Sequence, residues 1–182
     1  MRTSRVERAT AETKVLVELD LDGTGVAEIS TGVGFFDHML RQIAKHGAVD
    51  LRVSTQGDLE VDAHHTIEDT ALALGAALAE ALVQAAVDLS GRPYVVHEEP
   101  ALPPTIGPVY PASMTRHIWE SLGHSARITL HVSVLRAARP GMTPDAHHVV
   151  EAQFKAFARA MREAVSLDPR AGGAVPSTKG VL

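Results

Sequence analysis

Two kinds of hydrophobic pattern divide the chain into strands and helices. Apolar residues alternate with polar ones, or run together briefly, in stretches that predict strands at residues 14–22, 26–31, 49–55, 86–89, 94–98 and 126–135. Elsewhere they recur every three or four positions, which predicts helices at residues 38–46, about 64–82, 117–124 and about 147–165. We expect Asp37 to cap the first helix and Gly47 to end it. The mixture indicates an α+β fold.

The predicted elements occur in the same order twice. In each half, strands are followed by a short helix that begins with a histidine (His38, His117), another strand and a long helix that begins with a histidine pair. We therefore expect a duplicated two-layer module, with residues 1–83 as the first repeat and 84–182 as the second, in one compact subunit with pseudo-twofold symmetry. Each half should be a mostly antiparallel four-stranded sheet with two helices on one face.

Composition excludes several classes of function. A formal net charge of −5 and only four Phe, two Tyr and one Trp argue against a nucleic-acid-binding surface. No apolar run is long enough to cross a bilayer, and the first residues show no secretory signal, so we expect a cytoplasmic protein without membrane contact. The chain has no cysteine, which excludes disulfides and thiolate sites, but it has ten histidines.

Each long helix begins with the same motif, a histidine pair followed by a glutamate three residues after the second histidine. Adjacent helical residues point about 100° apart, so the two histidines of a pair cannot easily bind one ion. We expect them to serve two different ions, with the glutamate joining one of these. With the histidines of the short helices, the candidate ligands are His38, His64, His65, Glu68, His117, His147, His148 and Glu151.

Nitrogen and oxygen ligands without sulfur suit Mn, Zn, Fe or Ni and do not choose among them. A single histidine near a helix start is usually a core or capping residue, but the recurrence of three ligand-type residues in both halves favours a metal site. We expect His97, His124 and His131, which lie outside the motif, to be structural or surface residues.

The chain resembles the imidazoleglycerol-phosphate dehydratases in stretches that cover nearly all of it. These are GFFDHML at 34–40, AHHTIEDTA at 63–71, DLSGRPY at 88–94, RHIWESL at 116–122, AHHVVEAQFKA at 146–156 and PSTKG at 176–180. The resemblance implies a homo-oligomer of 24 subunits with active sites between subunits and two Mn²⁺ ions in each. It implies removal of water from a small phosphate ester, imidazole glycerol phosphate, to give imidazole acetol phosphate in histidine biosynthesis. It also implies the same eight ligands.

The resemblance further implies residues that contact the substrate. Its phosphate would be bound by Gln42, His46, Arg92, Lys155, Ser177 and Lys179, and Glu12 would be the catalytic carboxylate that takes the proton. By themselves these residues read as a turn arginine, solvated helix positions, a polar tail and an exposed carboxylate.

One junction departs from the family. The family carries a long loop after the first His-His helix, but here Leu82 runs directly into Val83, and no Gly, Pro, Asn or Ser follows to end the helix before Ser90. Either the loop is deleted, with loss of a phosphate-binding arginine and part of the active-site cover, or the protein carries a mobile loop that the printed sequence lacks. We favour the second explanation.

Two other functions remain open at this point. The same ligands could activate water in a binuclear metallohydrolase. If the loop is truly deleted, the chain could instead be a metal-assembled oligomer without catalytic activity.

Overall fold

The computed structural model describes residues 2–85, 92–138 and 142–166. Its helices are α1 (Gly34–Gly47), α2 (His64–Ala85), α3 (Met114–Ala126) and α4 (Ala146–Val165). Its strands are β1 (Thr3–Ala9), β2 (Thr13–Asp20), β3 (Ala27–Ser30), β4 (Asp50–Gly57), β5 (Tyr94–Glu98), β6 (Thr105–Ile106), β7 (Tyr110–Pro111) and β8 (Thr129–Ser133). This is the α+β composition that the hydrophobic pattern predicts. No helix within these ranges is both long and apolar enough to traverse a bilayer.

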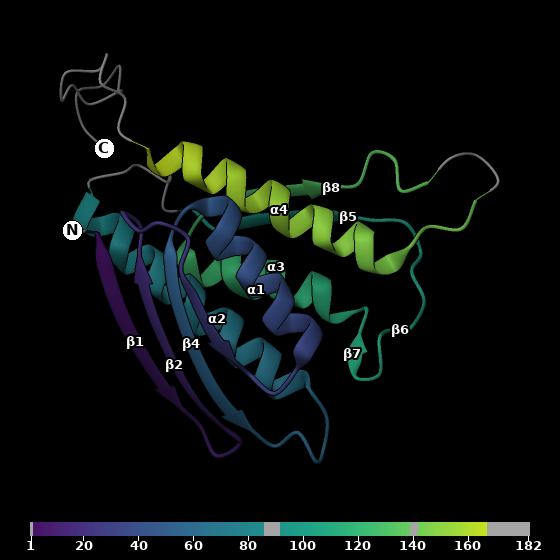
Figure 1. The fold of residues 1–182 in the computed structure, drawn as a ribbon, viewed down its shortest axis with the longest axis horizontal. Helices are drawn as coiled ribbons and strands as arrows, with labels where there is room; N and C mark the ends of the chain where they lie inside the picture. The colour runs from purple at the N-terminus through teal and green to yellow at the C-terminus, as the bar shows by residue number, and fades with distance from the viewer. Residues whose placement is uncertain (1, 86–91, 139–141, 167–182) are drawn as a thin grey trace.

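The first half contains the four-stranded sheet that the sequence predicts, but the sheet is mixed. Its strand order is β1-β2-β4-β3, in which β2 is antiparallel to β1 and β4 while β3 is parallel to β4. Helix α2 packs on the inner face of this sheet, and the sheet curves around it in Figure 1. The alternating residues Val15, Val17 and Leu19 of β2 are buried beneath it.

The prediction of a second four-stranded antiparallel sheet is wrong for the described residues. Strand β5 pairs with β8 in parallel, and the only other pairing described in this half is the short antiparallel β6–β7 ladder. Strands β5 and β8 can be parallel because the chain returns to the sheet through helix α3 rather than through a hairpin. The predicted strand at 86–89 lies outside the described residues.

The helices lie between the two sheets and form most of the core. Helix α2 packs against α3 and α1 against α4, so each half contributes one helix to each pair (Figure 1). The largest buried side chains include Phe36 from α1, Trp119 from α3, Phe154 from α4 and Tyr110 from β7. In both halves a short helix connects two parallel strands, in the orders β3-α1-β4-α2 and β5-α3-β8-α4. This arrangement brings the starts of the long and short helices together.

The caps of α1 differ from the prediction. The helix begins at Gly34 and Asp37 lies in its first turn, where the carboxylate accepts hydrogen bonds from the backbone N–H (2.9 Å) and hydroxyl (2.5 Å) of Thr31. The left-handed residue that follows the helix is Ala48, with φ 53°, rather than Gly47. Asp37 therefore anchors the segment that leads into the helix instead of capping it.

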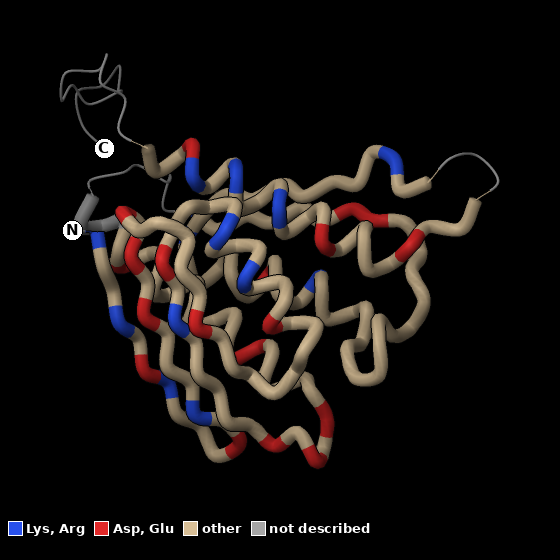
Figure 2. The backbone as a smooth tube through the Cα atoms, viewed as in Figure 1, with Lys and Arg blue, Asp and Glu red and all other residues tan. Residues whose placement is uncertain are grey.

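Strand β1 and the outer face of the first sheet are strongly charged. Figure 2 shows acidic and basic residues interleaved along β1, β2 and β4. Arg5 pairs with Glu7 and Glu18, and Arg52 pairs with Glu18 and Glu28. Exposed ion pairs of this kind add little stability, but charged side chains protect an edge strand from pairing with other chains.

A close approach of α2 and α3 predicts a destabilising substitution. A Cβ atom on Gly75 would lie 2.6 Å from Ser125 Cβ and 2.7 Å from Leu122 O, both in α3. Helix propensity alone favours alanine over glycine by about 1 kcal/mol. Overpacking opposes this by roughly 1–3 kcal/mol, so we expect Gly75→Ala to lower the free energy of unfolding.

Urea unfolding would measure this effect against Gly34→Ala, since a Cβ on Gly34 would have nothing within 4 Å. A Gly75→Ala variant as stable as the Gly34→Ala control would mean that the two helices are less tightly packed than described.

Candidate metal centre

Three potential ligands from α1 and α4 meet in one place, which we name the α1–α4 cluster: His38, His147 and Glu151. One nitrogen or oxygen of each lies within 4.8 Å of the others. His38 Nε2 is 3.4 Å from Glu151 Oε1, and the rings of His38 and His147 are 5.6 Å apart. Ligand atoms bound to one ion at roughly 2.0–2.2 Å can lie up to about 4.2 Å apart, so small side-chain shifts would close this set around a metal.

A second set, the α2–α3 cluster, is the counterpart with the halves exchanged, namely His64, Glu68 and His117, but among the described residues only the first set has all of its ligand atoms within 4.8 Å of one another. His64 Nε2 lies 3.3 Å from Glu68 Oε2, and the rings of His64 and His117 are 5.3 Å apart. Each cluster therefore joins the long helix of one half to the short helix of the other. The structure thus brings three of the eight predicted ligands closely together and places three more in a looser second group.

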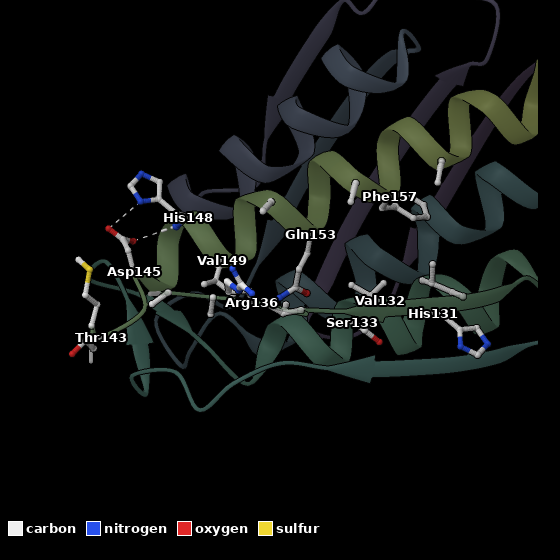
Figure 3. Close-up of a pocket in the computed structure, with 18 residues that line it drawn as sticks. His131, Val132, Ser133, Arg136, Thr143, Asp145, His148, Val149, Gln153 and Phe157 are labelled. Atoms are coloured by element: carbon white, nitrogen blue, oxygen red, sulfur yellow. Dashed lines mark hydrogen bonds and ion pairs between the residues drawn. The ribbon is translucent and has the colours of Figure 1, made fainter. Parts of the chain in front are cut away.

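The second histidine of each pair faces a different group. His65 Nδ1 lies 3.0 Å from Asp58 Oδ2, and His148 Nδ1 lies 3.2 Å from Asp145 Oδ2. Figure 3 shows His148 beside Asp145 at the N-terminal end of α4. The rings of neighbouring histidines are steeply inclined, by 74° in the first pair and 66° in the second. Within this subunit, the two histidines of a pair do not point to one ion.

Neighbouring groups shift the pKa values of two candidate ligands in opposite directions. The pKa of Glu151 lies below its ordinary value, chiefly because Lys155 Nζ donates a hydrogen bond to its carboxylate at 2.9 Å. The pKa of His65 is raised, first by its hydrogen bond to Asp58 and to a smaller extent by the charges of Asp58 and Glu12. At neutral pH, Glu151 is thus an ionised carboxylate. A metal ion could take the place of the Lys155 ammonium group as its partner.

Glu12 is exposed in the turn between β1 and β2, and its charge acts on His65. Thr10 Oγ1 accepts hydrogen bonds from the backbone N–H of Glu12 (3.2 Å) and of Thr13 (3.0 Å). The buried Asp69 of α2 accepts hydrogen bonds from the hydroxyls of Thr13 and Thr10. The start of α2 therefore holds the turn that carries Glu12 close to the second histidine.

Three predicted phosphate contacts also lie together. His46 Nε2 is 3.1 Å from Gln42 Oε1 on α1, and Lys155 of α4 reaches Glu151 of the α1–α4 cluster. Burial lowers the pKa of His46, and the nearby charges of Lys155 and Arg159 lower it further. This part of the surface is therefore basic and lies next to the α1–α4 cluster.

The structure does not bring the other residues predicted to bind the phosphate next to the α1–α4 cluster. Arg92 is exposed ahead of β5, where its backbone carbonyl accepts a hydrogen bond from the Thr129 hydroxyl. The contacts of the described residues connect its side chain to neither cluster. Ser177 and Lys179 lie outside the described residues.

The other histidines have local partners. The side chain of His97 is buried, with Nε2 2.9 Å from Gln153 Oε1. His124 is exposed on α3, and His131 stacks beside the exposed Tyr94. Sequence reasoning missed Asp58 and Asp145, although an aspartate close before each histidine pair was the available signal.

Comparison with known proteins decides the family. The sequence model of the family described as imidazoleglycerol-phosphate dehydratase matches residues 31–86 and 78–161. The chain belongs to this family. It is therefore an enzyme, a carbon–oxygen lyase of histidine biosynthesis, as the motifs predicted.

Relatives match over their whole length. The chain is 69% identical to the imidazoleglycerol-phosphate dehydratase of Salinispora arenicola (strain CNS-205) and 54% identical to that of Streptomyces coelicolor, covering 100% of this chain and 99% of each relative. Among solved structures, the Staphylococcus aureus dehydratase is 25% identical with a TM-score of 0.78, covering 91% of this chain and 99% of that one. The Pyrococcus furiosus enzyme, in complex with (S)-C348, is 28% identical with a TM-score of 0.73, covering 97% and 100%.

The comparisons also place the difference in length between this chain and its relatives at the end of α2. The alignment with the Salinispora arenicola relative spans 201 residues, 19 more than the 182 of this chain. The two parts of the family match overlap at 78–86, which places the interruption at the junction that lacks a helix-ending residue. Helix α2 continues there to Ala85.

The described residues of the second half leave a groove between β8 and α4. Strand β8 and α4 line a groove of about 830 Å³, with Val132, Val149 and Phe157 on its walls (Figure 3). In the first half, β2 occupies the corresponding place against β4 and α2. An apolar groove that the described residues leave open at this position supports the explanation that the protein carries residues absent from the printed sequence.

An intact mass would decide this question. The printed sequence corresponds to 19.4 kDa, and 19 further residues of average mass would add about 2 kDa. We expect the heavier value. A mass of 19.4 kDa would instead establish a true deletion and favour a metal-assembled oligomer without catalytic activity.

Proposed function

We propose that the protein catalyses the manganese-dependent dehydration of imidazole glycerol phosphate to imidazole acetol phosphate in the cytoplasm. The observation that carries this proposal is the α1–α4 cluster of two histidines and a carboxylate, together with its looser α2–α3 counterpart, in a chain of this family. Nitrogen and oxygen donors without sulfur suit manganese.

Eight residues would hold two ions at each active site. Each cluster would supply three ligands, and the second histidine of each pair would complete a site on another subunit. In support, the His65 and His148 side chains keep 40% and 75% of their surface exposed and are directed away from their own clusters. We propose a homo-oligomer of 24 subunits with active sites between them. Removing the metal would then also weaken the assembly.

The proposed chemistry divides between the metals and the protein. When bound, manganese would hold the imidazole nitrogens and stabilise negative charge on the ring. The Glu12 carboxylate would remove the proton from substrate C2 as the hydroxyl departs from C3, and together they leave as water. The resulting enol becomes the ketone of the product.

The phosphate would be bound beside the α1–α4 cluster. Lys155 supplies an ammonium group, and Gln42 and His46 supply further polar contacts at the same place. We retain Arg92, Ser177 and Lys179 as proposed contacts on the strength of the family motifs.

Turnover of the substrate tests the proposal. We expect manganese-loaded protein to convert imidazole glycerol phosphate to imidazole acetol phosphate, chelation to stop the reaction and added manganese to restore it. Release of inorganic phosphate without the ketone would indicate a metallohydrolase instead. Metal-bound protein that forms neither product would contradict catalysis.

A further inference from the structure

Each histidine that faces away from its own cluster has an aspartate beside its ring, hydrogen-bonded to His65 and within ion-pair distance of His148. Asp58 follows β4 and lies seven residues before His65, whereas Asp145 caps α4 and lies three residues before His148. The two aspartates thus occupy different positions in the two halves. They nevertheless place a carboxylate oxygen at similar distances, 3.0 and 3.2 Å, from the same ring nitrogen, Nδ1. A carboxylate beside the same ring nitrogen, reached from two different places, points to a shared role.

The chemistry of this contact fixes the position of the ring proton. An ionised carboxylate can only accept hydrogen bonds, so the Nδ1 that faces it must carry hydrogen. A neutral imidazole has one ring hydrogen, and Nε2 then holds a free electron pair. Hydrogen bonding at one ring nitrogen commonly sets which nitrogen a metal binds.

Each carboxylate is itself well constrained. Asp145 Oδ1 accepts a hydrogen bond from the backbone N–H of His148 at 3.2 Å while Oδ2 faces its ring, so one carboxylate holds both parts of the residue (Figure 3). Asp58 is half-buried, and its Oδ1 atom has no hydrogen-bond partner among the described residues. Among the described residues, His65 is therefore the principal partner of the Asp58 carboxylate.

We propose that Asp58 and Asp145 are positioning residues that keep His65 and His148 in the Nδ1–H form, with Nε2 presented to a metal ion shared with another subunit. The metal part of this inference rests on the proposed function, but the tautomer does not. Asp58→Asn and Asp145→Asn test it with little change of shape. Asparagine still caps a helix, so the amide of Asp145→Asn would keep its oxygen on the backbone N–H and turn its NH₂ group toward the ring. At position 58, an NH₂ group buried without an acceptor is unfavourable, which again directs it to the ring.

Magic-angle-spinning NMR of metal-free, ¹⁵N-histidine-labelled protein reads the tautomer directly. We expect Nδ1–H in the unmodified protein and a change to Nε2–H at His65 in Asp58→Asn and at His148 in Asp145→Asn. His124 is an internal control, because its Nδ1 lies 2.7 Å from the backbone carbonyl of Glu120 and should not change. An unaltered tautomer at both histidines would overturn the proposal.

Manganese titration tests the consequence for metal binding. We expect each variant to weaken affinity by roughly 10- to 100-fold. Asp62→Asn is the matched control, since Asp62 accepts a hydrogen bond from the backbone N–H of His64 at 2.7 Å and should be replaceable without effect. A changed tautomer with unchanged affinity would refute the positioning role. Failure of the unmodified protein to bind manganese would refute the proposed function while leaving the tautomer result intact.

Discussion

Replacing Glu12 by glutamine should abolish turnover and leave the manganese content unchanged. The carboxylate is the proposed base for substrate C2, and it lies on an exposed turn outside both clusters, close enough to influence His65. Loss of a positioned base slows a reaction by roughly 10²- to 10⁴-fold. Steady-state kinetics with metal analysis of the same sample would measure both quantities.

Glu7→Gln is the matched control for this experiment. Glu7 is an exposed glutamate of β1 that pairs with Arg5, and its loss should leave turnover unchanged. If Glu12→Gln turned over substrate as fast as this control, Glu12 would have no catalytic role.

Replacing Glu151 by glutamine should remove one of the two ions and with it the activity. Glu151 is the carboxylate of the α1–α4 cluster, where His38 and Lys155 both contact it. A neutral amide is a poor ligand for a hard cation and would also leave the Lys155 ammonium group without its partner. We expect bound manganese to fall from two ions to one per active site, as read by elemental analysis after gel filtration.

Glu120→Gln supplies the comparison for this second variant. Glu120 is a helical glutamate that pairs with Arg116 at 2.8 Å, and its replacement should leave two ions bound. Two tightly bound ions in Glu151→Gln would mean that the α1–α4 cluster is not a metal site.

Local patterns were sufficient to predict the helices and most of the strands. The long helices were expected at about 64–82 and 147–165 and occur at His64–Ala85 and Ala146–Val165, because a sustained apolar stripe overrides small differences at the ends. The histidine spacing likewise predicted that neighbours would face apart, since helix geometry alone requires it.

Features that depend on tertiary contacts were not predictable. Strand β1 was missed because Arg5 and Glu7 obscure its alternation, and its pairing with β2 becomes visible only in the sheet. Asp37 resembles a cap in sequence, but it binds Thr31 from within the helix. The contact between Asp58 and His65 depends on how the chain turns between β4 and α2.

The prediction of the second sheet was wrong for a different reason. Its prediction assumed an antiparallel sheet, whereas the described strands β5 and β8 are joined through helix α3 and pair in parallel. Helix capping had already marked the junction after Leu82 as unusual, but a capping argument does not reveal how many residues are involved.

The central claim is that the two clusters are manganese sites. Crystals grown with manganese and measured on both sides of its absorption edge would test it most directly. We predict one anomalous peak among His38, His147 and Glu151 and another among His64, Glu68 and His117, each completed by the second histidine of a pair from another subunit. Manganese bound elsewhere, with neither cluster occupied, would contradict the account.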